Sequence, residues 1–173
     1  MVKIIIYSMI CLFFCGHCAA QEVVLKTNVL YWGTLTPNMA FEFKVSKHLS
    51  LELPVGYNAW KSSTEGRSLR HYAFQPELRR WFCRPFEGHF VGVHGHYAKY
   101  NMGNMPFMPE TKGYMYKGNL WGAGLSYGFH WIVGTRWGLE ANIGLGYAYI
   151  NYKKYIEGEC CAEVVSKVKK HYL

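Results

Sequence analysis

Two histidines separated by a single residue, His94 and His96, are the first candidates for chemistry. On an extended strand, residues two apart point to the same face, so the pair offers two imidazole ligands to a metal ion. A zinc site needs a third ligand, and His130 has the matching parity. If Tyr100 pairs with Tyr116, however, His130 lies eight residues beyond the partner of His94, about 26 Å away. That distance favours separate histidines that hydrogen-bond to their neighbours.

Ser126 and His130 also share a face, and together with Glu140 they have the residue types of a hydrolase triad. Four strand residues separate Ser126 from His130 by about 13 Å, whereas a base must lie within about 3 Å of its nucleophile. The chain contains no Asp, which argues against Asp-based calcium loops, aspartic dyads and Ser-His-Asp triads. We therefore expect no catalytic residue, no metal site and no cofactor.

A third group of residues is suited to holding charge rather than to reacting. Four glutamates and three basic residues share one parity of the alternating segments described below: Lys26, Glu42, Lys44, Glu52, Glu77, Arg79 and Glu140. A charge removed from water must be paired to be tolerated, so we expect an ion-paired polar network in an interior. A small ion path is the functional alternative. A barrel of few strands leaves an interior filled by side chains, which favours the network.

The elements that would position these residues are strands, because apolar and polar residues alternate along the chain after residue 20. The alternation predicts seven strands, at residues 23–31, 39–45, 49–57, 71–82, 89–97, 116–131 and 137–152. One parity is apolar and aromatic, and the other mixes glycine with single charges. A membrane barrel needs this pattern, because its outer face meets lipid and side chains fill its lumen. The expected fold class is all-β, an antiparallel up-and-down transmembrane β-barrel.

The connections between these segments differ in length. Residues 46–48, 83–88 and 132–136 are short turns, whereas 58–70 and 99–115 are long. Short periplasmic turns and long external loops are typical of outer-membrane barrels. Aromatic residues gather near the strand ends, as interfacial girdles do. The outer girdle would contain Tyr31, Trp32, Tyr57, Trp60, Tyr72, Tyr97, Tyr100, Tyr149 and Tyr152, and the periplasmic girdle Phe43, Trp81, Phe82, Trp131 and Trp137.

The N-terminus has the layout of a secretory signal peptide. Lys3 precedes an apolar run at residues 4–14, and small residues end the segment at Cys18-Ala19-Ala20. The run is shorter than the ~20 residues of a membrane-spanning helix, so we expect cleavage after Ala20. The mature domain, residues 21–173, then carries 18 cationic and 11 acidic side chains, a net charge of +7.

A basic exported chain suits phosphate-rich lipopolysaccharide or anionic lipid, although the charge also serves simple solubility at the loop tips. Nucleic acid is not an expected partner, because an exported protein seldom meets it. The mature domain retains Cys83, Cys160 and Cys161, and an odd number of cysteines makes a poor disulfide framework.

Several runs of residues in combination resemble a known family. They are LKTNVLYW at 25–32, TPN at 36–38, GYNAW at 56–60, QPELR at 75–79, WF at 81–82, GHFVG at 88–92, GAGLSYG at 122–128 and LEANIGLGY at 139–147. Over nearly all of residues 25–155 the chain resembles domain of unknown function 3575, a family of small outer-membrane barrels of Gram-negative gut and oral bacteria. The resemblance implies eight strands and supplies no catalytic residue. In that family an apolar eighth strand follows a region like 167–172. Residues 164–173 contain too few apolar positions to replace it, so the domain is expected to be C-terminally incomplete.

These features predict a non-enzymatic outer-membrane β-barrel with a structural or surface-interaction role through its external loops. The expected partners are outer-membrane lipid, lipopolysaccharide, the barrel-assembly machinery and a surface protein. Met102, Met105, Phe107 and Met108 are the candidate contacts for that protein, or they fold back onto the rim. Two alternatives stay open: an outer-membrane lipid-modifying enzyme, and a soluble periplasmic barrel that binds a small apolar ligand.

Overall fold

The computed structural model describes residues 22–33, 35–61, 68–104, 113–156 and 164–172. Within them the chain forms nine strands and one short helix. The predicted signal peptide, residues 1–20, lies outside the described residues. The elements are β1 (Val23–Lys26), α2 (Val29–Gly33), β2 (Asn38–Lys44), β3 (Leu49–Lys61), β4 (Ser68–Phe74), β5 (Glu77–Trp81), β6 (Gly88–Gly103), β7 (Tyr114–Val133), β8 (Trp137–Ile156) and β9 (Val164–Tyr172).

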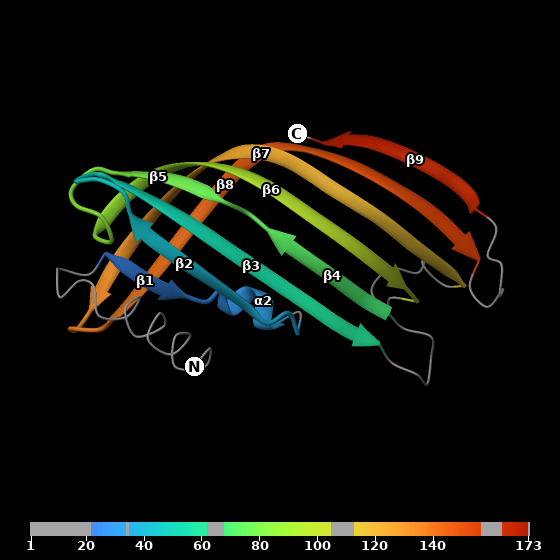
Figure 1. Ribbon diagram of the computed structural model, residues 1–173, viewed down its shortest axis with the longest axis horizontal. Coiled ribbons are helices and arrows are strands. Elements are labelled where there is room, and N and C mark those ends of the chain that lie inside the picture. Colours follow the sequence, from blue (N-terminus) through green and yellow to red (C-terminus); the bar gives the residue numbers. More distant parts are fainter. Residues whose placement is uncertain (1–21, 34, 62–67, 105–112, 157–163, 173) are drawn as a thin grey trace, which may run out of the picture.

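All the strands belong to one antiparallel sheet with the order β1-β2-β3-β4-β6-β7-β8-β9 (Figure 1). β5 pairs with both β3 and β6, so β4 and β5 are two halves of one interrupted strand. The interruption falls at Gln75 and Pro76, because a proline has no N–H to donate to the ladder. Pro76 still contributes its carbonyl oxygen, which accepts a hydrogen bond of 3.0 Å from the N–H of Gly95.

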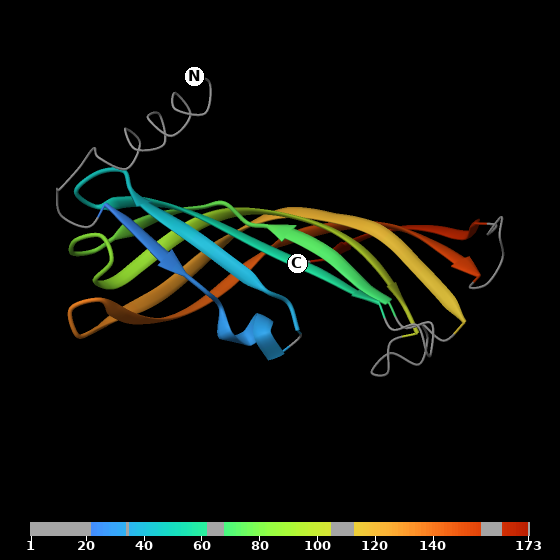
Figure 2. The same ribbon diagram turned by 60° about the horizontal axis from the view of Figure 1, so that its bottom comes forward.

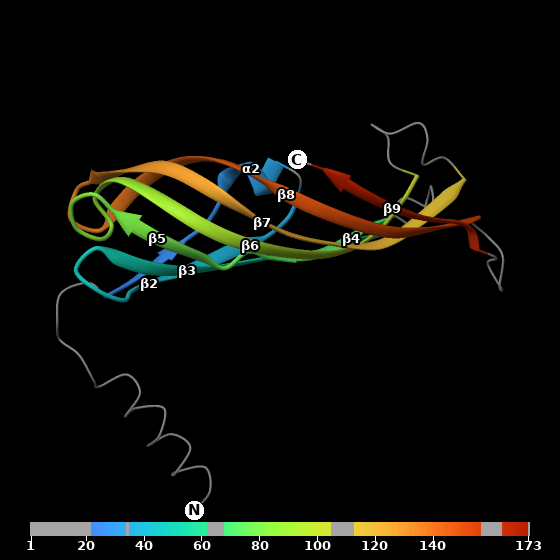
Figure 3. The same cartoon turned by 90° about the horizontal axis from the view of Figure 1, so that it is seen from above.

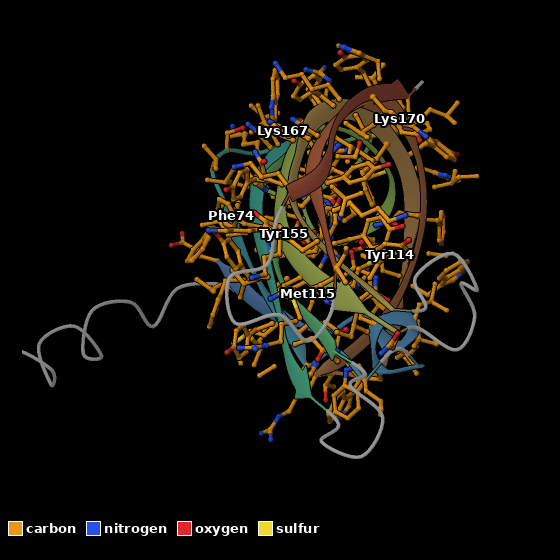
Figure 4. The ribbon with its side chains drawn as sticks, turned by 90° about the vertical axis from the view of Figure 1, so that its right-hand side faces the viewer. Phe74, Tyr114, Met115, Tyr155, Lys167 and Lys170 are labelled. Carbon is orange, nitrogen blue, oxygen red and sulfur yellow. The ribbon has the colours of Figure 1, made fainter. Side chains whose placement is uncertain are left out.

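The sheet is twisted and arched, which gives it an inner and an outer face (Figures 2 and 3). The core lies on the inner face near the short turns, where the rings of Trp81 and Phe90 are fully buried and 4.8 Å apart. Gly128 makes room for this core, because a Cβ atom there would collide with the Phe90 ring. Figure 4, seen from the other end, shows the strands curving round a space that side chains fill.

The two ends of the sheet differ in their connections, although the long connection predicted at residues 58–70 is shortened to residues 62–67, because β3 and β4 extend into it. Short turns join β2 to β3, β5 to β6 and β7 to β8 at one end, which lies on the left in Figure 1. At the opposite end, connections of ten and seven residues join β6 to β7 and β8 to β9, whereas the connection from β3 to β4 has six residues, as many as the turn from β5 to β6. Among the described residues, the protein has no helix that is both apolar and long enough to cross a membrane.

The first predicted strand, residues 23–31, is wrong in its second half. The strand ends at Lys26, and α2 follows it. Asn28 explains the change, because its side-chain oxygen accepts a 2.9 Å hydrogen bond from the N–H of Leu30 and so caps the helix N-terminus. The side chain of Asn38 fixes this position by accepting from the N–H of Asn28 at 2.6 Å and donating to its carbonyl at 2.9 Å.

Sequence alternation also missed a strand at the C-terminal end. Residues with few apolar positions form β9, which pairs with β8 from Ala148 to Tyr155. Backbone hydrogen bonds to the long strand β8 support this segment, so it needs no apolar stripe of its own. The eight strands in the sheet order equal the number that the resemblance implies. Among the described residues, neither residues 137–147 of β8 nor the outer edge of β1 has a further strand beside it.

Candidate functional site

The densest group of chemically active side chains lies on the inner face, across β2, β3 and β5. The register pairs Glu42 with Glu52, and Glu52 with Glu77, so three carboxylates stand in one row. All three are buried. Like charges directly opposite each other on neighbouring strands destabilise a sheet, and burial strengthens the repulsion. The row therefore requires cations on the same face.

Arg79 supplies one cation from the same face of β5. Its guanidinium is only 1% exposed and forms ion pairs with Glu42 at 3.4 Å, with Glu77 at 3.0 Å and with Glu52. A planar group with five donors is suited to several carboxylates at once. The guanidinium carbon also lies 4.4 Å from the centre of the Phe90 ring, a cation–π contact that suits a desolvated guanidinium.

Lys26 and Glu140 join this group from distant parts of the sheet. Lys26 is in β1 and Glu140 is in β8, and the Lys26 Nζ lies 2.5 Å from Glu140 Oε2. Lys26 also pairs with Glu42, and Arg79 Nη1 lies 2.9 Å from Glu140 Oε1. These contacts cross the interior, so β1 and β8 face each other there. We call Lys26, Glu42, Glu52, Glu77, Arg79 and Glu140 the inner ion cluster.

Neutral donors extend the inner ion cluster toward the core. The Ser50 hydroxyl donates to Glu42, and the indole N–H of Trp81 donates to the Ser50 oxygen at 2.7 Å. Sequence analysis placed Trp81 in the periplasmic girdle, and this is wrong, since the side chain is buried on the inner face. Trp81 is two residues after Arg79 on the same strand, so the sequence already indicates that the two side chains share a face.

Of the hydrolase arrangement, His130 and Glu140 lie side by side, whereas Ser126 is hydrogen-bonded to Glu77 instead of His130. Ser126 donates to Glu77 Oε1 at 2.7 Å, and His130 Nδ1 lies 3.4 Å from Glu140 Oε2. Both side chains therefore lie at the border of the inner ion cluster. A buried carboxylate that is paired and hydrogen-bonded costs far less than an isolated one, so this arrangement stabilises charge in an interior.

Six of the seven charged residues singled out in the sequence thus lie together. The exception is Lys44, which is exposed at the end of β2 opposite Ser50. Among the described residues, no acidic side chain forms an ion pair with Lys44. It follows that four carboxylates share two cations in the cluster.

The histidine pair lies on the inner face with its rings 5.7 Å apart. The predicted pairing of Tyr100 with Tyr116 is wrong by two residues, because Tyr100 pairs with Gly118. A long connection does not fix the register of a hairpin as a two-residue turn does. His94 then faces Gly124, six residues or about 20 Å from His130. In the described part of the chain, no three His, Cys, Asp or Glu residues are placed to hold a metal ion.

The predicted contact loop is only partly described. Met102 is half-buried at the end of β6 and pairs with Tyr116, whereas Met105, Phe107 and Met108 lie outside the described residues. Sequence analysis missed a group of basic residues on the outer face of β4, β6, β7, β8 and β9. Most of them lie beyond the predicted strand ends at 97 and 152, so they had no assigned face.

Comparison with known proteins gives one match. The profile of a family described as "Protein of unknown function (DUF3575)" matches residues 4–173. No curated protein and no solved structure matches the chain. The family match covers nearly the whole sequence, including every strand of the described sheet. The chain therefore belongs to the DUF3575 family.

Proposed function

We propose that this protein is a non-enzymatic β-barrel of the bacterial outer membrane. Its role is structural or one of surface interaction, exercised at the end that bears the long connections. The observation that carries the proposal is the polarity of the arched sheet, which is apolar outside and ionic inside.

One row of residues paired across neighbouring strands is apolar all the way around the outer face. Its members, from β1 to β8, are Val23, Phe43, Leu51, Leu78, Val93, Leu125 and Leu145. Leu125 is 64% exposed and Leu145 84%, whereas Glu42 in the neighbouring inner row is 0% exposed. A sheet in water turns its apolar face inward, but a sheet in lipid must turn it outward. The pattern therefore supports a membrane barrel and weighs against a soluble periplasmic one.

The height of the apolar band agrees with a membrane. On β7 the outer residues Ala123, Leu125, Tyr127 and Phe129 lie between Trp121 and Trp131. Ten strand residues span about 33 Å, or about 25 Å along the membrane normal at a tilt of about 40°. The lipid-facing band of outer-membrane barrels is about 25 Å tall and is bordered by aromatic residues.

Closure of the sheet is supported by the ion pair between Lys26 and Glu140, which brings β1 and β8 face to face. The barrel needs this closure, because lipid cannot satisfy unpaired backbone donors and acceptors. The short turns would face the periplasm, and the long connections would face the outside. Expected partners are outer-membrane lipid, lipopolysaccharide and, during insertion, the barrel-assembly machinery.

Heat-modifiable migration tests the proposal. The mature chain is taken from isolated outer membranes and compared by gel electrophoresis with and without boiling. A closed barrel resists the detergent, so the unboiled sample is expected to migrate faster than the boiled one. A single slow band in both samples, or recovery of the chain in the soluble periplasmic fraction, would overturn the proposal.

A further inference from the structure

The outer face becomes basic where the strands approach the long connections. The strand register gives three consecutive outer rows across β4, β6, β7, β8 and β9. The first row is mainly aromatic: Phe74, Tyr97, Trp121, Tyr149 and His171. The second is Tyr72, Lys99, Asn119, Asn151 and Lys169, and the third is Arg70, Asn101, Lys117, Lys153 and Lys167. We call the six exposed cations of the last two rows the basic belt: Arg70, Lys99, Lys117, Lys153, Lys167 and Lys169.

Three lysines of the basic belt stand directly beside one another. Lys117 pairs with Lys153, and Lys153 pairs with Lys167. Side chains in such pairs start about 5 Å apart, and like charges placed so are mutually destabilising. Figure 4 labels Lys167 together with Tyr155 of the neighbouring strand, viewed from the long-connection end.

The described part of the chain offers no counter-charge to the basic belt. Its acidic residues lie in the inner ion cluster or near the short turns: Glu22, Glu42, Glu52, Glu77, Glu87 and Glu140. The other five glutamates of the chain, at positions 65, 110, 157, 159 and 163, lie outside the described residues. Within the described sheet, the repulsion between these lysines is therefore not relieved.

The depth of the basic belt decides which anions are within reach. From Leu125 in the middle of the apolar band, Asn119 is six residues away and Lys117 eight. These separations are about 20 and 26 Å along the strand, or about 15 and 20 Å along the membrane normal. Half of a hydrocarbon core is about 15 Å, so the belt lies at the level of lipid head groups.

A hollow of about 580 Å³ borders the same rows, and residues of both faces of the sheet line it, including the inner-facing Asn58, His71 and Tyr100. Its lining includes Arg70, Lys99, Asn101, Lys117, Asn119 and Lys153. Ammonium and guanidinium groups bind phosphate through charge-assisted hydrogen bonds, and amide groups both donate to and accept from sugar hydroxyls.

We propose that the basic belt binds the phosphate groups of a phosphorylated glycolipid of the lipopolysaccharide type in the outer leaflet. The proposal rests on the proposed function, because only a barrel that spans the membrane places the belt at head-group level. The lysines neutralise the sugar phosphates, the asparagines contact the sugar, and the aromatic row below contacts the upper acyl chains. Charge complementarity carries the assignment, since a row of adjacent cations matches a multiply charged ligand.

The test uses the mature chain refolded in detergent, with purified lipid A diphosphate as the probe. Binding is measured by fluorescence titration at two salt concentrations. The comparison ligand is the same glycolipid after enzymatic removal of its phosphates. The test variant is Lys117→Gln/Lys153→Gln. The control variant is Lys154→Gln/Lys170→Gln, which removes two inner-facing lysines from the same region.

Wild-type protein is expected to prefer the diphosphate, with an affinity that falls as salt rises. The test variant should bind about tenfold or more weakly, and the control within about twofold of wild type. Equal binding of the dephosphorylated glycolipid, or equal affinities of the two variants, would overturn the proposal. So would complete displacement of the glycolipid by low millimolar inorganic phosphate, which indicates a free-phosphate site, or by a polyglutamate peptide, which indicates an acidic protein partner.

The band shift on boiling is measured for each protein beside the titration. A wild-type protein that shifts but does not prefer the diphosphate overturns the basic belt alone. A wild-type protein that does not shift overturns the proposed function, and the belt assignment with it. A test variant that loses binding while keeping the shift separates ligand recognition from folding.

Discussion

Arg79 pairs with all four carboxylates of the inner ion cluster while lying against Phe90. Its removal would leave Lys26 as the only cation of the cluster. A buried carboxylate without a partner is much more costly than a buried pair, so most of the effect comes from the groups left behind. The residue therefore sets the stability of the whole interior.

We predict that Arg79→Met lowers the free energy of unfolding by about 3–5 kcal/mol. Urea unfolding in detergent micelles, followed by the loss of the faster gel band, measures this. Arg80→Met is the matched control, because Arg80 is exposed on the opposite face of the same strand. Equal losses in the two variants would contradict a buried charge centre at Arg79.

Gly92 is a second position where a small change is expected to alter the stability of the protein. A Cβ atom there would collide with the carboxylate of Glu77 and the hydroxyl of Ser126. We predict that Gly92→Ala costs about 1–3 kcal/mol, the usual range for overpacking a filled interior. Gly95→Ala serves as the control, since the nearest atom to a Cβ at Gly95 would be the Gly122 carbonyl oxygen, at an ordinary contact distance of 3.8 Å. The same unfolding measurement applies, and an unchanged Gly92→Ala midpoint would refute the close contact.

At the scale of the strand, β7 offers a test of depth. Leu125 lies at the middle of its apolar face, and Asn119 lies on the same face near the long connections. We predict that Leu125→Arg lowers stability in lipid vesicles by about 2–4 kcal/mol, whereas Asn119→Arg costs about 0–1 kcal/mol. Unfolding titrations of vesicle-inserted protein measure both. A depth-independent result would place this face in water.

The strands show why alternation predicts some features and not others. The sequence predicts which face each of Phe41, Glu42 and Phe43 occupies. Successive side chains on any strand point to opposite faces, whatever the position of the strand in the sheet. Strand ends are different. The segment predicted at 89–97 continues as β6 to Gly103, because backbone hydrogen bonding continues beyond the last residue of the apolar alternation.

Side chains that interact across an element boundary also escape local prediction. The cap that Asn28 provides depends on Asn38, ten residues later, so the apolar run before Trp32 is equally compatible with a strand. Likewise Tyr97 and Tyr100 cannot share a girdle, because their parities differ and Tyr100 faces inward with His71. The sequence alone indicates this, because two residues three positions apart on one strand point to opposite faces.

For the whole molecule, the sequence predicts which charges face inward but not which of them meet. Lys26 and Glu140 are 114 residues apart, and their contact depends on how far the sheet curls. Lys44 has the same parity as Glu42 yet remains exposed, because burial also depends on distance from the strand end. Curvature and depth belong to the assembled sheet, so neither can be derived from a local pattern.

The Lys26 contacts give a prediction about kinetics. Contacts between residues so distant in sequence form late, after the cost of closing the loop has been met. Lys26→Met is therefore expected to accelerate unfolding while changing the refolding rate by about twofold or less. Stopped-flow refolding and unfolding in detergent would measure both rates, with Lys44→Met as the control. A refolding rate that falls in step with stability would indicate early closure instead.

The location of the inner ion cluster also bears on the timing of membrane insertion. Strands β2, β3 and β5 carry three of its carboxylates, whereas Glu140 arrives only with β8. A half-finished sheet would present incompletely paired charges to hydrocarbon, which is strongly unfavourable. We therefore expect the proposed barrel to insert into the bilayer only after β8 has joined the sheet. A cluster that stabilises the finished protein would in this way also act as a checkpoint on when the chain commits to the bilayer.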